Sequence, residues 1–150
     1  MANKKIVSEF VRNNLYGKPD PDAIPRMHRM LYIDRSITDI NVKDSDYDDY
    51  TVLHWQAVCG TTGSVAWLLR QDPPPDIDVR SSINQGTPLM MAALSGGEDS
   101  EGKVRLLLDH GADRDLKDYY DNTALSFARA NNKPFAVTYM LENYRPDVSR

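Results

Sequence analysis

Apolar and polar residues follow a helical spacing along this chain, in short segments separated by turns. Near the start, apolar residues share one face over residues 3–15 (Ile6, Phe10, Val11 and Leu15) and again over residues 22–33 (Ile24, Met27, Met30 and Leu31). A Gly- and Pro-containing break at residues 17–21 separates the two segments. We expect two helices here, the first of them amphipathic and charged on its outer face.

Residues 85–118 contain a helix–loop–helix–turn unit. Thr87 can accept a hydrogen bond from a free backbone N–H at the start of a helix. Pro88 fits the first helical position, because its missing N–H would have no partner there. A second apolar run follows at residues 104–108, and Gly111 can take the left-handed conformation common at helix ends.

The same unit recurs on either side. Thr51, Thr87 and Thr123 each begin a short apolar segment and lie 36 residues apart. Apolar triplets of the second helix recur at residues 67–69, 106–108 and 139–141. The distance from each threonine to its triplet places one insertion at residues 97–102 and another at residues 73–75. We expect the first to be a mobile loop. The second consists of three prolines and is expected to form a stiff extended corner. Without these insertions the period is about 33 residues.

These residues resemble ankyrin repeats. Residues 87–93 (TPLMMAA) match the family phrase TPLHxAA, residues 106–113 (LLLDHGAD) match its second-helix ending, and residues 51–54 (TVLH) keep the histidine. A weaker copy is suggested by residues 38–44, TDINVKD. The resemblance implies an all-α ankyrin-repeat solenoid of stacked helix-turn-helix pairs with protruding hairpin loops.

In this register, one domain of residues 1–150 comprises a degenerate capping repeat (1–44), two repeats (46–80 and 82–117) and a C-terminal capping repeat (118–150). Terminal repeats of a solenoid cover the end of the core and face water outward, so a charged first helix fits a cap.

Some residues depart from the family pattern. Val52 and Ala124 replace the usual proline, Asp49 and Asp121 stand where the turn glycine is usual, and Gly86 comes one position late. We expect these departures to alter the hairpins and not the fold.

Composition limits the kinds of partner and the cellular compartment that we expect for this chain. The net charge of −4 argues against nucleic acid, because binding phosphates needs a basic surface. Cys59 is the single cysteine, so no intramolecular disulfide is possible and a reducing compartment suits the chain. The sequence shows neither a secretory signal nor a run of 18 apolar residues. We therefore expect a monomeric, cytoplasmic protein that does not bind membranes.

Candidate catalytic residues are few. His54 takes the family position where the imidazole typically bridges neighbouring loops by hydrogen bonds. Cys59 falls near the end of a first helix, where packing is expected, and His110 lies beside the negative end of a helix. His28 is isolated, so no metal-ligand spacing links the histidines. We expect no enzymatic activity and no cofactor.

The acidic segment at residues 44–50 has the spacing of calcium ligands at Asp44, Asp46 and Asp48. An EF-hand loop starting there requires Gly at its sixth position and Glu at its twelfth, where Asp49 and Trp55 stand. We therefore interpret the segment as a protruding hairpin without a bound metal.

The resemblance implies a non-enzymatic module that binds a partner protein through its concave face and hairpin tips. Two alternatives stay open. One is a small inhibitory, immunity-type or host-targeting effector protein of the same class. The other, which we favour less, is an enzyme whose site lies in an insertion such as residues 96–102.

The x position of TPLHxAA holds Trp55, Met91 and Phe127, all large and apolar. These side chains either fill the space between adjacent first helices or form an exposed stripe on the concave face, and we favour the stripe. Its expected flanks are Asp46, Tyr47, Asp49 and Tyr50 on one hairpin and Tyr119, Tyr120 and Asp121 on another. Such a surface suits a partner with apolar and basic contact residues, and Trp55→Ala is expected to weaken binding with little loss of fold.

Overall fold

The computed structural model describes residues 21–33, 35, 38–45, 47–95, 99–131 and 134–145. Its elements are α2 (Ala23–His28), the π-helix η1 (Arg29–Ile33), α3 (Val52–Cys59), α4 (Thr62–Leu69), α5 (Pro88–Leu94), α6 (Ser100–Asp109), α7 (Ala124–Ala130) and α8 (Phe135–Asn143). Within these residues the only β pairing is an isolated bridge between Asp44 and Tyr50. The predicted helix at residues 3–15 lies outside the described residues.

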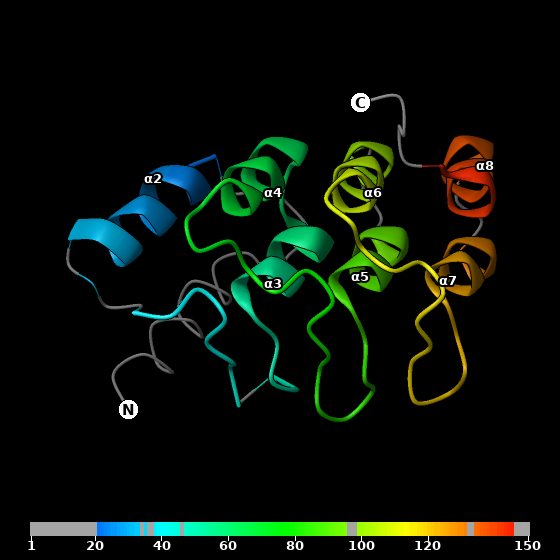
Figure 1. The fold of residues 1–150 in the computed structure, drawn as a ribbon, viewed down its shortest axis with the longest axis horizontal. Helices are drawn as coiled ribbons and strands as arrows, with labels where there is room; N and C mark the ends of the chain where they lie inside the picture. Colours follow the sequence, from blue (N-terminus) through cyan, green and yellow to red (C-terminus); the bar gives the residue numbers. More distant parts are fainter. Residues whose placement is uncertain are drawn as a thin grey trace.

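The helices form two rows (Figure 1). One row contains α3, α5 and α7, and the other contains α2, α4, α6 and α8, with hairpin loops projecting beside the first row. Helix α5 packs against α3 on one side, α7 on the other and α6 in the second row. This arrangement confirms the predicted all-α solenoid, in which each helix pair is covered by its neighbours.

Capping residues place the first helices as the sequence predicts. The hydroxyls of Thr51, Thr87 and Thr123 accept hydrogen bonds from backbone N–H groups three residues on, at 3.4, 3.4 and 3.3 Å. Pro88 occupies the first turn of α5. Gly111 lies just after the end of α6 and has a φ of 91°, which a glycine adopts without strain. Local sequence therefore fixes where these helices begin and end.

The turn residues that stand at the usual glycine position adopt a left-handed conformation. Asp49, Gln85 and Asp121 lie 36 residues apart and have φ angles of 54°, 56° and 63°. Gly86 follows one position later, where a Cβ atom would lie 3.2 Å from Met91 Cε, so a side chain there would require a small shift of that methyl group. Asp48 is left-handed as well, with a φ of 55°, so the three hairpins share this position but do not have identical turns.

One hydrophobic core runs through all the described repeats. Fully buried alanines on the first helices, including Ala57 and Ala93, let adjacent helices approach closely. Met27 and Met30 are buried at the first end of the core, which confirms that the helix predicted over residues 22–33 faces inward with these residues.

The prediction of a loop over residues 97–102 is wrong for its second half. Helix α6 begins at Ser100, and residues 97 and 98 lie outside the described residues. A Cβ atom on Gly102 would lie 2.4 Å from Thr62 Oγ1, so this glycine lets α6 pack against α4. The glycine has a packing role inside a helix, and its presence was misread as a loop signal. At residues 73–75 the chain has neither helix nor strand.

Candidate protein-binding surface

Three hairpin loops, called fingers below, project from the first-helix row. Finger 1 is residues 44–50, finger 2 is residues 81–86 and finger 3 is residues 118–122. In each finger the backbone N–H of the first residue donates to the carbonyl oxygen of the last, at 2.9 Å. The protruding hairpin predicted at residues 44–50 is therefore confirmed.

The fingers are joined to one another by backbone hydrogen bonds. The N–H of Ser82 in finger 2 donates to the carbonyl oxygen of Asp48 in finger 1, at 3.0 Å. The N–H of Tyr119 in finger 3 donates to the carbonyl oxygen of Asn84 in finger 2, at 2.8 Å. Main-chain atoms thus link all three tips, and the carboxylates of Asp48 and Asp49 add hydrogen bonds between fingers 1 and 2.

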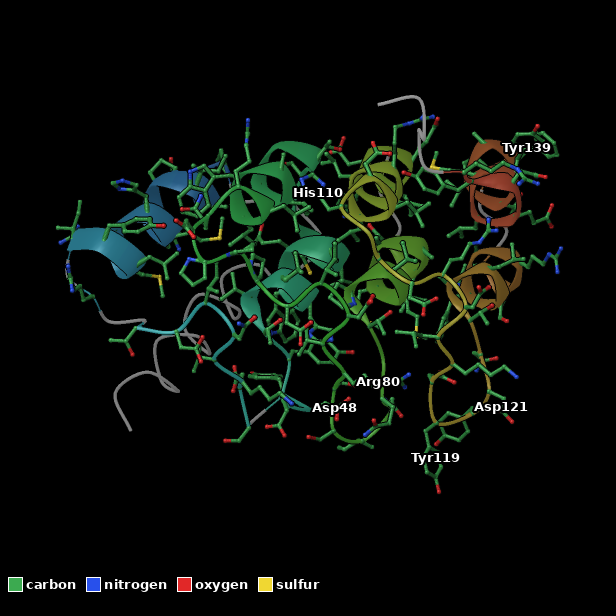
Figure 2. The ribbon with its side chains drawn as sticks, viewed as in Figure 1. Asp48, Arg80, His110, Tyr119, Asp121 and Tyr139 are labelled. Carbon is green, nitrogen blue, oxygen red and sulfur yellow. The ribbon has the colours of Figure 1, made fainter. Side chains whose placement is uncertain are left out.

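A large apolar or aromatic residue stands at the same position of each finger, two residues before Asp49, Gln85 or Asp121. These residues, Tyr47, Ile83 and Tyr119, lie 36 residues apart and are called the fingertip row. Ile83 is 71% exposed and Tyr119 is 72% exposed, and the ring of the exposed Tyr120 packs edge-on against Tyr119. Figure 2 shows Tyr119 at the end of finger 3. Sequence reasoning missed Ile83, although the 36-residue spacing could have identified it.

The predicted exposure of Trp55 and Met91 is wrong. Both are 6% exposed and belong to the core, and Phe127 is partly buried against the core. The rings of Tyr47 and Tyr50 pack on the Trp55 indole at centroid distances of 5.6 and 5.1 Å, and the Tyr50 hydroxyl lies 3.3 Å from the Met91 sulfur. Finger 1 thus folds back over these side chains and buries them.

Of the predicted acidic contacts, Asp49 is engaged within the fingers, as are the neighbouring acids Asp48 and Asp118. The carboxylates of Asp48 and Asp49 accept hydrogen bonds from finger 2, and that of Asp118 accepts from two backbone N–H groups of its own finger at 2.9 and 2.8 Å. Asp121 is exposed on finger 3, and Asp46 lies outside the described residues. Three of the acids therefore shape the fingers, and Asp121 faces solvent.

His54 bridges the start of α3, directly after finger 1, and finger 2, in line with the loop-bridging role that its sequence position predicts. Its Nδ1 lies 3.1 Å from the N–H of Thr51, and its Nε2 lies 2.9 Å from the carbonyl oxygen of Gly86. The neutral ring with a proton on Nε2 satisfies both partners, since Nδ1 then accepts and Nε2 donates. Burial lowers the pKa of His54, and the Tyr50 ring stacks on the imidazole at 4.9 Å.

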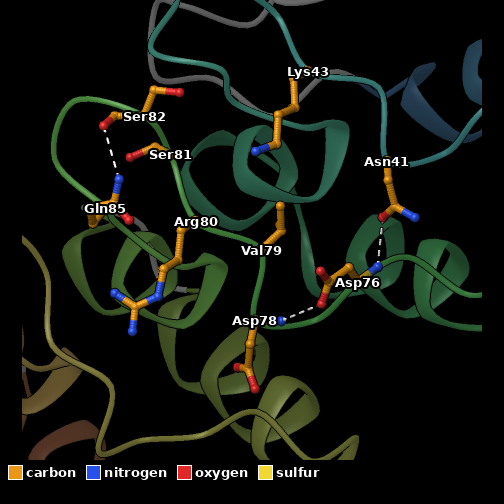
Figure 3. A pocket seen from close by; sticks show the side chains of 9 residues that line it. All are labelled: Asn41, Lys43, Asp76, Asp78, Val79, Arg80, Ser81, Ser82 and Gln85. Carbon is orange, nitrogen blue, oxygen red and sulfur yellow. Dashed lines mark hydrogen bonds between the residues drawn. The ribbon is translucent and has the colours of Figure 1, made fainter.

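A second series of hydrogen bonds links the repeats beside the fingers. The side-chain oxygen of Asn41 accepts from the N–H of Asp76 at 2.7 Å, as Figure 3 shows. One repeat later, the carboxylate of Asp78 accepts a hydrogen bond from the backbone N–H of Asp113 at 3.0 Å. The adjoining cavity has a volume of about 440 Å³. It is lined by side chains of both charges, namely Lys43, Arg80, Asp76 and Asp78. Burial is the main cause that raises the pKa of Asp78.

The described residues contain no group of three or more His, Cys, Asp or Glu side chains that could hold a metal ion. Cys59 is the last residue of α3, and its partial burial raises the pKa of its thiol. Within the described part of the chain, no helix has the length and apolar character needed to cross a membrane.

Comparison with known proteins agrees with this geometry. Residues 53–150 match the ankyrin repeats family in three copies, so the chain belongs to the ankyrin-repeat family. Members of this family are generally non-enzymatic modules for protein–protein interaction. The chain is also 32% identical, over 144 residues and 86% of its length, to a transient receptor potential cation channel subfamily A member 1 homolog of Caenorhabditis elegans. It spans 11% of that relative's length.

Proposed function

We propose that this chain binds another protein through the fingertip row. The observation that carries the proposal is the exposure of a large apolar residue at the same register position of fingers 2 and 3, where Ile83 and Tyr119 are both more than two-thirds exposed. Adjacent exposed apolar side chains often mark a protein-binding surface. Because backbone bonds already hold the fingers in place, little ordering entropy is lost when a partner binds.

The chemistry of the row suggests the partner's contact residues. Ile83, Tyr119 and Tyr120 suit apolar side chains, and the exposed carboxylate of Asp121 suits a lysine or arginine beside them. Of the residues proposed from sequence as direct contacts, Trp55 supports Tyr47 of the row from beneath, and Met91 lies against Tyr50. The chain would act by binding and not by catalysis, in a reducing compartment such as the cytoplasm, where Cys59 stays a thiol.

Affinity capture with matched variants tests this proposal. Wild-type protein is immobilised beside an Ile83→Ser/Tyr119→Ser variant and a Phe135→Ser variant, and proteins captured from host-cell extract are quantified by mass spectrometry. Phe135 is 79% exposed on α8, so its replacement removes a comparable apolar surface outside the fingers. We expect one captured protein to be lost with the fingertip variant and retained with the α8 variant. Equal capture by all three proteins would contradict the proposal.

A further inference from the structure

Helix α8 carries two exposed aromatic residues on the second row of helices. Phe135 is 79% exposed and Tyr139 is 55% exposed, and their rings lie against each other at a centroid distance of 5.6 Å. They are four residues apart, so they share one face of the helix. Figure 2 shows Tyr139 in the second row and Tyr119 at the end of finger 3, on opposite edges of the molecule. The aromatic pair is therefore a surface separate from the fingertip row.

The aromatic pair lies beside a groove between α6 and α8. Phe135 holds the register position of Gly102 in α6, since each stands five residues before the middle residue of its second-helix triplet. Gly102 leaves room for Thr62 of the preceding repeat, whereas the larger ring of Phe135 lies at the surface. The groove has a volume of about 430 Å³ and is lined by Tyr139 and by residues of both helices. Two described helices form it, so it does not depend on what precedes or follows them.

The α6 side of the groove carries two exposed charges of opposite sign. Glu101 and Arg105 are four residues apart on α6, and both line the groove. Two further charges line it at a greater distance along the helices. These are Asp109, which accepts a hydrogen bond from the Tyr144 hydroxyl at 2.6 Å, and Arg145 after α8. Near the aromatic pair, the surface thus presents one acid and one base, which a second copy of the same surface complements better than a partner of a single charge sign.

We propose that this surface, called the α6–α8 face and comprising Glu101, Arg105, Phe135 and Tyr139, binds the same face of a second copy of the chain. In a two-fold symmetric contact, residue i of one copy meets residue j of the other, and j meets i. With the helices of the two copies antiparallel about an axis midway between Glu101 and Arg105, each Glu101 opposes the Arg105 of the other copy. Phe135 and Tyr139 stand one residue past the register positions of Glu101 and Arg105, a shift of about 1.5 Å along a helix. Nearly the same axis therefore brings each Phe135 against the Tyr139 of the other copy.

The size of the α6–α8 face indicates a weak dimer. A specific, stable interface buries about 800 Å² per partner. An aromatic side chain can bury about 150–250 Å², so the two partly exposed rings supply roughly 300 Å², to which the charged pair adds. We expect a dissociation constant of about 10 µM to 1 mM. At lower concentration the chain is then a monomer, as expected from its sequence.

Sedimentation velocity of the full chain tests the dimer. Wild type is measured from about 5 µM to about 1 mM, after circular dichroism has shown that the variants fold alike. Phe135→Ser/Tyr139→Ser should weaken self-association about tenfold or more, because buried aromatic side chains often dominate an interface. Ile33→Ser, at an apolar residue that is 68% exposed at the end of η1, is the control and should dimerise as wild type does.

Exchanging the two charges tests the two-fold arrangement. Glu101→Arg places arginines of the two copies opposite one another and should weaken self-association about tenfold or more, since like charges across an interface repel. Glu101→Arg/Arg105→Glu restores opposite charges at both contacts and should return the affinity to within about threefold of wild type. The double variant keeps the net charge of the chain, so this recovery reports the pairing of the two positions.

The outcomes distinguish this inference from the proposed function. A chain that stays monomeric up to about 1 mM, or a charge exchange that fails to restore association, overturns the inference. Ile83→Ser/Tyr119→Ser should dimerise as wild type does. If this variant instead abolishes self-association, the copies meet through the fingertips and the inference is wrong. Capture of a partner that depends on the fingertip row supports the proposed function whether or not the chain dimerises.

Discussion

The backbone N–H of Tyr119 lies 2.8 Å from the carbonyl oxygen of Asn84, and this bond joins finger 3 to finger 2. Ser82 and Asp48 make the corresponding bond between fingers 2 and 1 at 3.0 Å. Because main-chain atoms carry these links, the exposed side chains of Ile83 and Tyr119 are not needed to hold the fingers in place. Changes to those side chains can therefore test binding without loosening the surface.

Trp55 is expected to matter for stability. Trp55→Ala should lower the free energy of unfolding by about 3–5 kcal/mol, because it leaves a cavity beneath finger 1. Trp55→Phe should cost less, since a ring remains and the indole N–H has no hydrogen-bond partner among the described residues. Urea denaturation of the two variants measures both values. Similar small losses for both would mean that Trp55 is not a core residue.

The protein should become less stable as the pH falls, because of His54. Burial lowers its pKa below the ordinary value of 6.5, so the unfolded chain takes up a proton at higher pH than the folded chain. The contribution is fully present above pH about 6.5 and is lost as the pH falls toward the folded pKa. We compare unfolding of wild type and His54→Met across this range, since Met90 occupies the equivalent place in α5.

His54→Met should lower the free energy of unfolding by about 1–3 kcal/mol at neutral pH, because the buried carbonyl of Gly86 loses its donor. The stability of this variant should change less on acidification than that of the wild type. His110→Gln, at an exposed helix end, is the control. Parallel pH profiles for wild type and His54→Met would contradict this account of the bridge.

Lys103 is a buried cation that joins two helix ends. Its Nζ donates to the carbonyl oxygen of Gly60 after α3 and to the hydroxyl of Ser95 after α5, at 3.0 Å each. Lys103→Met should lower the free energy of unfolding by about 1–3 kcal/mol, because the buried Gly60 carbonyl then lacks this donor. Lys117→Met, at an exposed lysine, should change stability by less than about 0.5 kcal/mol. Equal thermal melting of the two variants would show that the Lys103 bonds contribute little.

The repeats were predictable because their signals are local. Thr51, Thr87 and Thr123 cap helices through contacts within one turn, and aspartate at positions 49 and 121 accepts the left-handed turn that glycine usually takes. These features depend on a few neighbouring residues, so spacing alone was enough to place them.

The surface was less predictable because burial depends on contacts between distant residues. Trp55 looked exposed in its helix register, but the rings of Tyr47 and Tyr50 cover it once finger 1 folds back. Lys103 gave no sign of burial, since its partners lie 43 and 8 residues away in the chain. Ile83 was overlooked because its residue type differs from the tyrosines of the other fingers.

Isothermal titration of the captured partner tests the central claim most directly. The partner identified by affinity capture is titrated with wild type, Ile83→Ser/Tyr119→Ser and Phe135→Ser, after circular dichroism has shown that all three fold alike. The account predicts that the fingertip variant binds at least about 30-fold more weakly, equivalent to about 2 kcal/mol, and that Phe135→Ser binds as wild type does. Unchanged affinity for the fingertip variant, or an equal loss with Phe135→Ser, would contradict it.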